Sequence, residues 1–256
     1  MLCKNGDFME QIQLYGVKID NVTMEEAVYR SLRATGEPCV VFTPNALMLE
    51  RSRKNAELAE LLNHASLSLP DGAGVLRAAE KMGMPLCERV AGIDFGAKIL
   101  ARAERAGLRI FLLGGGENVA EKAAENLLKK HPRLCICGTT WGYFNKIGEE
   151  NTRVISYIRA CRPDVLFVCM GFPIQERWVV ENLHHLTDVR VIACIGGSLD
   201  VWAGNIRRAP LWMSRAGLEW FWRMLCQPKR LAALPEMLSF LWHVPQKEEF
   251  TGENPL

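Results

Sequence analysis

The chain has 256 residues, of which 49% are hydrophobic and 23% charged, the composition of a globular protein that can bury a sizeable core. This balance excludes a disordered chain, a coiled coil and a collagen-like fibre. The formal net charge is only +2, from 31 Lys+Arg and 29 Asp+Glu, so no overall field attracts nucleic acid and no nucleic-acid partner is expected.

Up to about residue 200, short apolar runs alternate with segments of helical pattern. The runs are rich in Val, Ile, Leu and Cys without strict polar alternation, which is typical of strands covered by helices on both faces. Thr23 followed by Glu26 predicts a helix start, and segments 55–65 and 117–131 are also expected to be helical. We therefore expect an α/β fold with a mostly parallel, Rossmann-like sheet flanked by helices. The candidate strands are 39–43, 67–69, 109–113, 134–138, 165–170 and 189–195.

The composition changes after Asp200. Five of the seven tryptophans lie in this last part, and Pro210, Pro228 and Pro235 divide it into short helices. Between residues 207 and 230 a single acidic residue, Glu219, stands against six basic ones. We predict two units, an α/β domain with a ligand cleft over residues 1–200 and a helical, basic and aromatic C-terminal appendage over residues 201–256. The basic residues are Arg207, Arg208, Arg215, Arg223, Lys229 and Arg230.

The nine cysteines include no CxxC pair, which favours reduced, buried thiols in a cytoplasmic protein. No side chains occur at metal-binding spacing, so no metal site is expected. Residues 1–15 carry Lys4, Asp7 and Glu10 and lack the apolar centre of a signal peptide. No uncharged stretch reaches the roughly 18 residues that a membrane-spanning helix needs. We therefore expect the chain to stay in the cytoplasm, where it can still lie on a membrane surface.

Polar or glycine residues follow each candidate strand. In parallel α/β sheets, loops and helix N-termini converge beyond the carboxyl ends of the strands, and ligands bind there. We therefore expect these residues to line one polar cleft. In chain order they are Thr43, Asn45, Asp71, Gly114, Gly115, Gly116, Tyr143, Gly171, Gln175, Gly196, Gly197, Ser198 and Asp200.

The glycine segments allow two interpretations. Segments 114–116 and 196–198 could hold a phosphate through backbone N–H groups, or they could be plain strand-to-helix turns. The dinucleotide fingerprint is incomplete, because Val119 stands where a third glycine belongs and Cys135 lies near the position of the ribose-binding acid. The sequence also lacks a Walker A motif.

The polar candidates have simpler alternatives as well. Asp71, within Pro-Asp-Gly, could be only a turn residue. Arg89 and Asp94 could form a surface ion pair and a helix cap, and Gln175 could merely occupy the first turn of a helix.

A set of short motifs runs in order from about Gly16 to Arg230. They are Thr43-Pro44-Asn45, Pro70-Asp71-Gly72-x-Gly74, Glu88-Arg89-Val90-x-Gly92-Ile93-Asp94, Gly171-Phe172-Pro173-x-Gln175-Glu176-x-Trp178, Gly196-Gly197-x-x-Asp200, Arg208-Ala209-Pro210-x-Trp212 and Gly217-Leu218-Glu219-Trp220. Together they resemble the WecG/TagA/CpsF family of glycosyltransferases, with the TagA branch the most similar.

The resemblance implies an inverting enzyme that moves N-acetylmannosamine from its UDP donor onto undecaprenyl-diphosphate-linked N-acetylglucosamine, as in the synthesis of a teichoic-acid linkage unit. Carried over by motif, Asp71 would be the general base, and Thr43, Arg89 and Gln175 would share the catalytic site. Asn45, Tyr143 and the other strand-end residues would bind the nucleotide sugar. The lipid-linked diphosphate would meet Arg208, Arg215, Arg223 and Arg230.

Members of this family also carry a basic C-terminal appendage, so the resemblance implies peripheral attachment to the anionic inner face of the cell membrane. The sequence contains no Asp-x-Asp triplet, which many transferases use to hold a metal. Arg89, loop N–H groups and helix dipoles are therefore expected to neutralise the leaving diphosphate without a metal or other cofactor. A homo-oligomer is left open.

Other functions are kept as alternatives. The chain could be another UDP-sugar transferase of the same family, serving capsule or exopolysaccharide synthesis. A nucleotide-dependent oxidoreductase is disfavoured by the incomplete fingerprint. A non-enzymatic, membrane-associated nucleotide-binding adaptor would keep the cleft without turnover.

Overall fold

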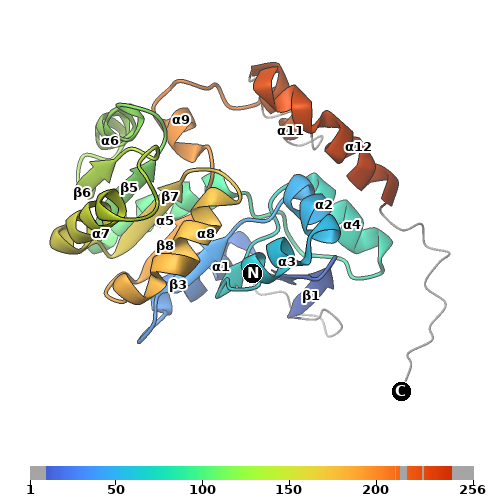
Figure 1. Ribbon diagram of the computed structural model, residues 1–256, viewed down its shortest axis with the longest axis horizontal. Helices are drawn as coiled ribbons and strands as arrows, with labels where there is room; N and C mark the ends of the chain where they lie inside the picture. Colours follow the sequence, from blue (N-terminus) through green and yellow to red (C-terminus); the bar gives the residue numbers. More distant parts are fainter. Residues whose placement is uncertain (1–9, 211, 214–217, 227, 244–256) are drawn as a thin grey trace.

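The computed structural model describes residues 10–210, 212–213, 218–226 and 228–243. Its centre is a six-stranded sheet in the order β4-β3-β8-β7-β5-β6, with every neighbouring pair parallel (Figure 1). All six carboxyl ends therefore meet at one edge. The strands are β3 (Cys39–Phe42), β4 (Leu67–Ser68), β5 (Arg109–Gly114), β6 (Cys135–Thr140), β7 (Val165–Cys169) and β8 (Val191–Cys194).

Helices cover both faces of this sheet. Successive strand residues point to opposite faces, so Phe111 and Leu113 join one hydrophobic cluster while Ile110 and Leu112 join the other. The first face packs against α2 (Ala46–Lys54), α3 (Ala56–Leu62), α4 (Ala73–Lys81), α7 (Glu149–Cys161) and α8 (Ile174–Asn182). The second packs against α1 (Met24–Arg33), α5 (Gly92–Ala106), α6 (Val119–Lys130) and α9 (Ser198–Trp202).

The predicted α/β architecture is confirmed. Each of the six predicted runs overlaps a strand, and the helices predicted at 55–65 and 117–131 are α3 and α6. Thr23 caps α1 by accepting a hydrogen bond from the backbone N–H of Glu26. Strand β6 runs beyond its predicted end because Thr139 and Thr140 pair with β5.

A two-stranded antiparallel hairpin, β1 (Gln11–Leu14) and β2 (Val17–Asp20), precedes the sheet. Its turn residues Tyr15 and Gly16 have φ of 51° and 80°, a left-handed pair that suits the twist of a tight hairpin. This hairpin is not among the elements predicted from the sequence. Its alternating apolar residues join the first-face core, where they back α2 and α3.

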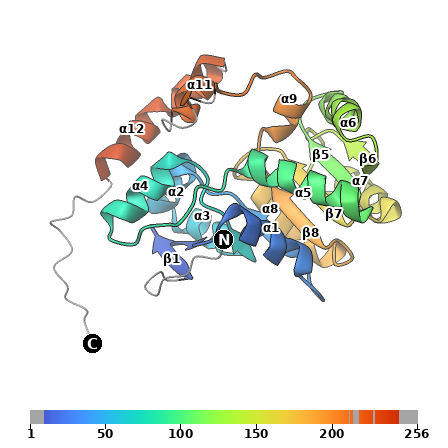
Figure 2. The same cartoon turned by 180° about the vertical axis from the view of Figure 1, so that it is seen from behind.

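The C-terminal part consists of α11 (Glu219–Cys226), the 3-10 helix η2 (Pro228–Ala233) and α12 (Leu234–His243). Helix α12 lies along α2 in both views (Figures 1 and 2). Phe240 is fully buried there, with its ring 6.0 Å from that of Tyr15. The Oγ of Ser239 donates to Glu50 at 2.6 Å. The helical appendage thus packs on the first-face core.

The predicted division at residue 200 falls inside α9 and stays a prediction. Several apolar side chains of the appendage face away from the core, with Trp242 86% exposed. Among the residues placed in the structure, no helix combines the length and hydropathy needed to cross a membrane. Among the described side chains of α11, η2 and α12, the other large exposed hydrophobic residues are Phe221, Leu225, Leu231 and Leu238.

Candidate active site

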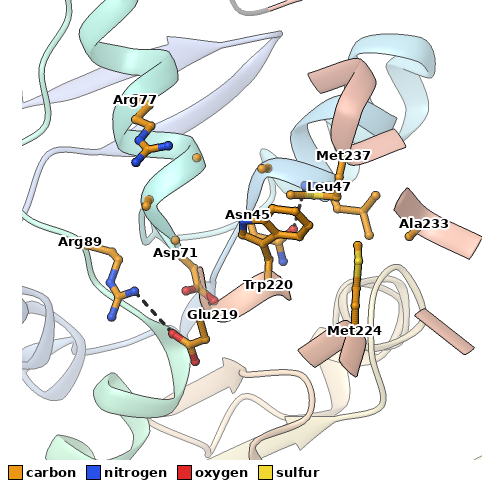
Figure 3. A pocket seen from close by; sticks show the side chains of 14 residues that line it. Asn45, Leu47, Asp71, Arg77, Arg89, Glu219, Trp220, Met224, Ala233 and Met237 are labelled. Carbon is orange, nitrogen blue, oxygen red and sulfur yellow. Dashed lines mark hydrogen bonds and ion pairs between the residues drawn. The ribbon is translucent and has the colours of Figure 1, made fainter. Parts of the chain in front are cut away.

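A pocket of about 170 Å³ lies between the first-face helices and the appendage (Figure 3). Its charged side chains, Asp71, Arg77, Arg89 and Glu219, gather at one end, and apolar side chains line the other. The remaining lining residues are Asn45, Ala46, Leu47, Gly72, Ala73, Gly74, Trp220, Met224, Ala233 and Met237.

Two helix N-termini open into this pocket. The first turns of α2 and α4 contribute lining residues, and the two helices approach so closely that a Cβ at Gly74 would lie 2.9 Å from that of Ala46. Helix N-termini carry partial positive charge, and Arg77 and Arg89 line the same pocket. The pocket therefore favours an anionic ligand.

Asp71 lies in the loop between β4 and α4. Its backbone N–H donates to the carbonyl of Pro44 at 3.1 Å, which ties this loop to the end of β3. The next residue, Gly72, has φ of 96° and is the N-cap of α4, a conformation that side-chain-bearing residues rarely adopt. This backbone places the half-buried Asp71 carboxylate in the pocket.

Two arginines, Arg77 and Arg89, line the pocket together with that carboxylate. Arg89 lines the same pocket and pairs with Glu219 of α11 at 3.5 Å. Arg208 pairs with Asp94 at 2.6 Å. The pKa of Arg208 is raised chiefly by its hydrogen bond to Asp94, with Glu219 and Asp71 adding to the effect. Arg208 is therefore within electrostatic reach of the pocket acids although it does not line the pocket.

Asn45 and Thr43 follow β3 but lie in different surroundings. Asn45 caps α2 through its Oδ1, which accepts from the backbone N–H groups of Leu47 and Met48, and it lines the pocket beside Asp71. Thr43 is 6% exposed, and its Oγ1 donates to the carbonyl of Cys194 at 3.1 Å. Thr43 thus joins β3 to β8 behind the pocket.

Gln175 does not line the pocket either. It is buried, and its Oε1 accepts from the backbone N–H groups of Gly171 and Gly196. Its Nε2 donates to Oε1 of Glu176 at 2.7 Å. Glu176 is fully buried and its Oε2 has no hydrogen-bond partner, so burial raises the pKa of this carboxyl to about 7.

The glycine loops stand at the middle of the carboxyl edge. Gly114 has φ of 135°, and a Cβ there would lie 2.3 Å from the carbonyl oxygen of Cys169, so only glycine fits against β7. The N–H of Gly115 donates to that carbonyl at 3.0 Å. Gly116 completes the turn into α6, which begins after Asn118 at φ 59°.

The residues near these loops have varied exposure. Tyr143, after β6, is 75% exposed, with its ring 6.4 Å from that of Trp141. At the end of β8, Gly197 is the N-cap of α9, and the buried Ser198 donates to the carbonyl of Ile195 at 2.7 Å. Asp200 lies in the first turn of α9. None of the predicted nucleotide-sugar residues except Asn45 lines the pocket.

Three of the arginines predicted to meet the lipid-linked diphosphate fall outside the described side chains. Arg215 lies outside the described residues, and the side chains of Arg223, in α11, and Arg230, in η2, also lie outside what the structure describes. Within the described part of the chain, no three His, Cys, Asp or Glu side chains are grouped as a metal would require.

Sequence reasoning missed several lining residues. Arg77 follows Ala73 by four residues, so both lie on one face of α4, and this spacing could have shown Arg77 beside Asp71. No local sequence pattern marks the other missed residues as pocket-lining, because only the packing of the appendage brings them to α2. They are Trp220, Met224 and Met237.

Comparison with known proteins identifies the family of the chain. Residues 12–253 match the Glycosyl transferase WecG/TagA/CpsF family. An N-acetylglucosaminyldiphosphoundecaprenol N-acetyl-beta-D-mannosaminyltransferase of Bacillus subtilis (strain 168) is 33% identical, with 82% of each chain covered. A protein of the same name from Staphylococcus aureus (strain MRSA252) is 30% identical over 91% of this chain and 92% of its own. The chain therefore belongs to the WecG/TagA/CpsF family of glycosyltransferases.

Proposed function

We propose that this protein transfers N-acetylmannosamine from UDP-N-acetylmannosamine to undecaprenyl-diphosphate-linked N-acetylglucosamine, with inversion at the anomeric carbon. The observation that carries the proposal is the pocket, where Asp71 stands among arginines and two helix N-termini and an apolar wall lies opposite. The names of the two relatives support the choice of sugars.

In this reaction Asp71 acts as general base. Its carboxylate takes the proton of the acceptor hydroxyl, for which it must lie within about 3 Å. The hydroxyl oxygen then forms a bond to the anomeric carbon as the bond from that carbon to the UDP oxygen breaks. Negative charge grows on the leaving diphosphate, where Arg89 and the helix N-termini of α2 and α4 stabilise it.

The apolar end of the pocket suits a prenyl acceptor. Leu47, Met224 and Met237 line this end, and burial of apolar surface there stabilises a bound isoprenoid by roughly 25 cal/mol per Å². The nearby surface of the appendage exposes further apolar side chains, Trp242 among them. We infer that this surface rests on the anionic inner face of the membrane, next to the lipid-linked acceptor, with the rest of the protein in the cytoplasm.

Release of UDP tests the reaction. The protein is incubated with UDP-N-acetylmannosamine and a short-chain lipid diphosphate N-acetylglucosamine, and UDP is measured with and without acceptor. We expect acceptor-dependent release and a disaccharide product. A preference for UDP-N-acetylglucosamine or another donor would indicate a different transferase of the family, and no release with any UDP-sugar would favour a binding adaptor.

Flotation with vesicles tests the membrane surface. Changing Leu231, Leu238 and Trp242 together to Ser removes exposed apolar side chains of η2 and α12. We expect weaker flotation with vesicles of anionic phospholipid and little change in stability. The matched control changes exposed Tyr29 and Leu128, on α1 and α6, to Ser. Equal loss of flotation in both variants would contradict the assignment.

A further inference from the structure

Gln175 and Glu176 are two enclosed polar side chains at the start of α8, 3% and 0% exposed. Burial of polar groups is costly unless they are hydrogen-bonded. The Gln175 Oε1 accepts from the N–H of Gly171 and from the N–H of Gly196, each at 3.2 Å. Gly171 follows β7 and Gly196 follows β8, so a single oxygen joins the loops of two neighbouring strands.

The orientation of the Gln175 amide is decided by its neighbours. Both glycine groups are donors, so only the amide oxygen can face them. The amide nitrogen then points to Oε1 of Glu176, 2.7 Å away. A flipped amide would place its NH₂ against two N–H donors and its oxygen against an acceptor. Glu176 therefore favours the one orientation in which Gln175 can hold both loops.

We propose that Gln175 and Glu176 are positioning residues of the donor site: Gln175 ties together the glycine loops after β7 and β8, and Glu176 fixes the Gln175 amide. This inference rests on the proposed function and on the sequence-based expectation that those loops bind the nucleotide sugar. The N–H groups of Gly171 and Gly196 are used by Gln175. These glycines, with φ of 80° and 55°, accordingly shape the loops and do not donate to a phosphate.

Two substitutions at Glu176 separate positioning from stability. Glu176→Met removes the acceptor and the buried charge at similar volume, whereas Glu176→Gln keeps an acceptor oxygen. We expect Glu176→Met to raise the KM for UDP-N-acetylmannosamine about fivefold, the effect of one lost hydrogen bond, without lowering the melting temperature. Glu176→Gln should keep the KM within about twofold. A purely structural role predicts no KM difference between the two variants, and that result would overturn the proposal.

Hydrogen exchange gives a readout that does not depend on turnover. In the full-length protein the Gly171 and Gly196 amides should exchange faster in Glu176→Met than in Glu176→Gln. Gln175→Glu places two carboxylates side by side, and above the pKa of Glu176 their repulsion should also release both amides. Adding Glu176→Gln to that variant restores a donor opposite the new carboxylate, and protection should return. Unchanged exchange in Glu176→Met, or no recovery of protection in the double variant, would refute the positioning role of Gln175 and Glu176.

Asn182→Asp is the matched control. It makes the same amide-to-acid change in a buried side chain of α8, where Asn182 donates to the carbonyl of Trp178 and accepts from Asn151. We expect lower stability with no specific change at the two glycine amides. If the wild-type protein released no UDP from any donor, the proposed function would fail. The hydrogen-exchange measurements would still test whether Gln175 and Glu176 hold the two glycine loops.

Discussion

The carboxyl edge of the sheet is built in two different ways. At its β3–β4 end, the pocket combines charged side chains from separate segments, and α11 supplies one of them, Glu219. At its centre, the loops after β5, β7 and β8 are made of glycines held by backbone groups and by the buried Gln175. The central loops are therefore preformed by the sheet, whereas the pocket is complete only when the appendage is docked.

The largest expected effect concerns this docking. Phe240→Ala removes a fully buried ring of α12 from the first-face core, and such truncations cost about 3–5 kcal/mol. If the appendage and the sheet unfold together, urea denaturation will show one transition shifted by this amount. A separate early transition of the appendage, with the sheet unchanged, would show that the pocket can open independently. Leu238→Ala, at an exposed position of the same helix, is the control.

The next effect concerns the pocket alone. Asp71→Asn keeps the size of the side chain and removes its basic oxygen, so transfer should fall by about a hundredfold or more. UDP binding should persist because Arg89 and the N-termini of α2 and α4 are untouched. The measurements are UDP release and calorimetric titration with UDP. Near-normal turnover would remove Asp71 from its role as base.

The central layout was predictable because it follows from local patterns. Apolar runs gave the six strands, and the rule that ligands bind beyond parallel strand ends placed Asp71 and Asn45 correctly on one edge. The same rule grouped Gln175 with them. Its side chain is instead buried, because its Oε1 accepts hydrogen bonds from the backbone N–H groups of Gly171 and Gly196. Glu219 stands 130 positions from Arg89 in the chain, and no local pattern encodes so distant a contact.

Two buried glutamates, Glu176 and Glu50, have pKa values shifted in opposite directions. The pKa of Glu176 is about 7 in the folded protein, against an ordinary 4.5, because burial disfavours its charge. Burial also raises the pKa of the nearby Cys194 thiol, which stays neutral. As the pH rises from 4.5 to 7, the unfolded state ionises first and the folded state loses relative stability. Glu176→Gln should thus match wild type at pH 4 and exceed it at pH 8, by at most about 3 kcal/mol.

Glu50 provides the opposite case. It is also fully buried, but hydrogen bonds from Arg53, Lys54 and Ser239 outweigh the effect of burial and lower its pKa to about 2. Its contribution to stability is present above pH 4.5 and is lost as the pH falls toward 2. Glu50→Gln should therefore destabilise the protein at pH 7. The measurement is the free energy of unfolding in urea for Glu176→Gln and Glu50→Gln at low and neutral pH. If both substitutions changed this free energy in the same direction at every pH, the opposite pKa shifts would be contradicted.

A smaller effect tests the link between appendage and pocket. Glu219→Gln removes the charge that pairs with Arg89, so Arg89 loses an orienting partner and turnover should fall about tenfold, roughly 1.4 kcal/mol. Glu236→Gln breaks the pair of α12 with Arg51, away from the charged end of the pocket, and is the matched control. Equal rates in the two variants would show that Glu219 only helps the appendage to dock.

The smallest expected effect is none at all. Metal-dependent transferases use a divalent cation to neutralise the leaving diphosphate. In the reaction that we propose, Arg89 and the N-termini of α2 and α4 take this role. Turnover measured in EDTA should therefore equal turnover in buffer, and added Mg²⁺ or Mn²⁺ should not raise it. Combining EDTA with Arg89→Gln sharpens the test, because loss of the guanidinium should lower the rate equally with and without metal. If Mg²⁺ restored the activity of Arg89→Gln, the cation would be shown to substitute for the arginine. Strict metal dependence of the wild type would contradict the proposal that Arg89 and the helix N-termini neutralise the leaving diphosphate.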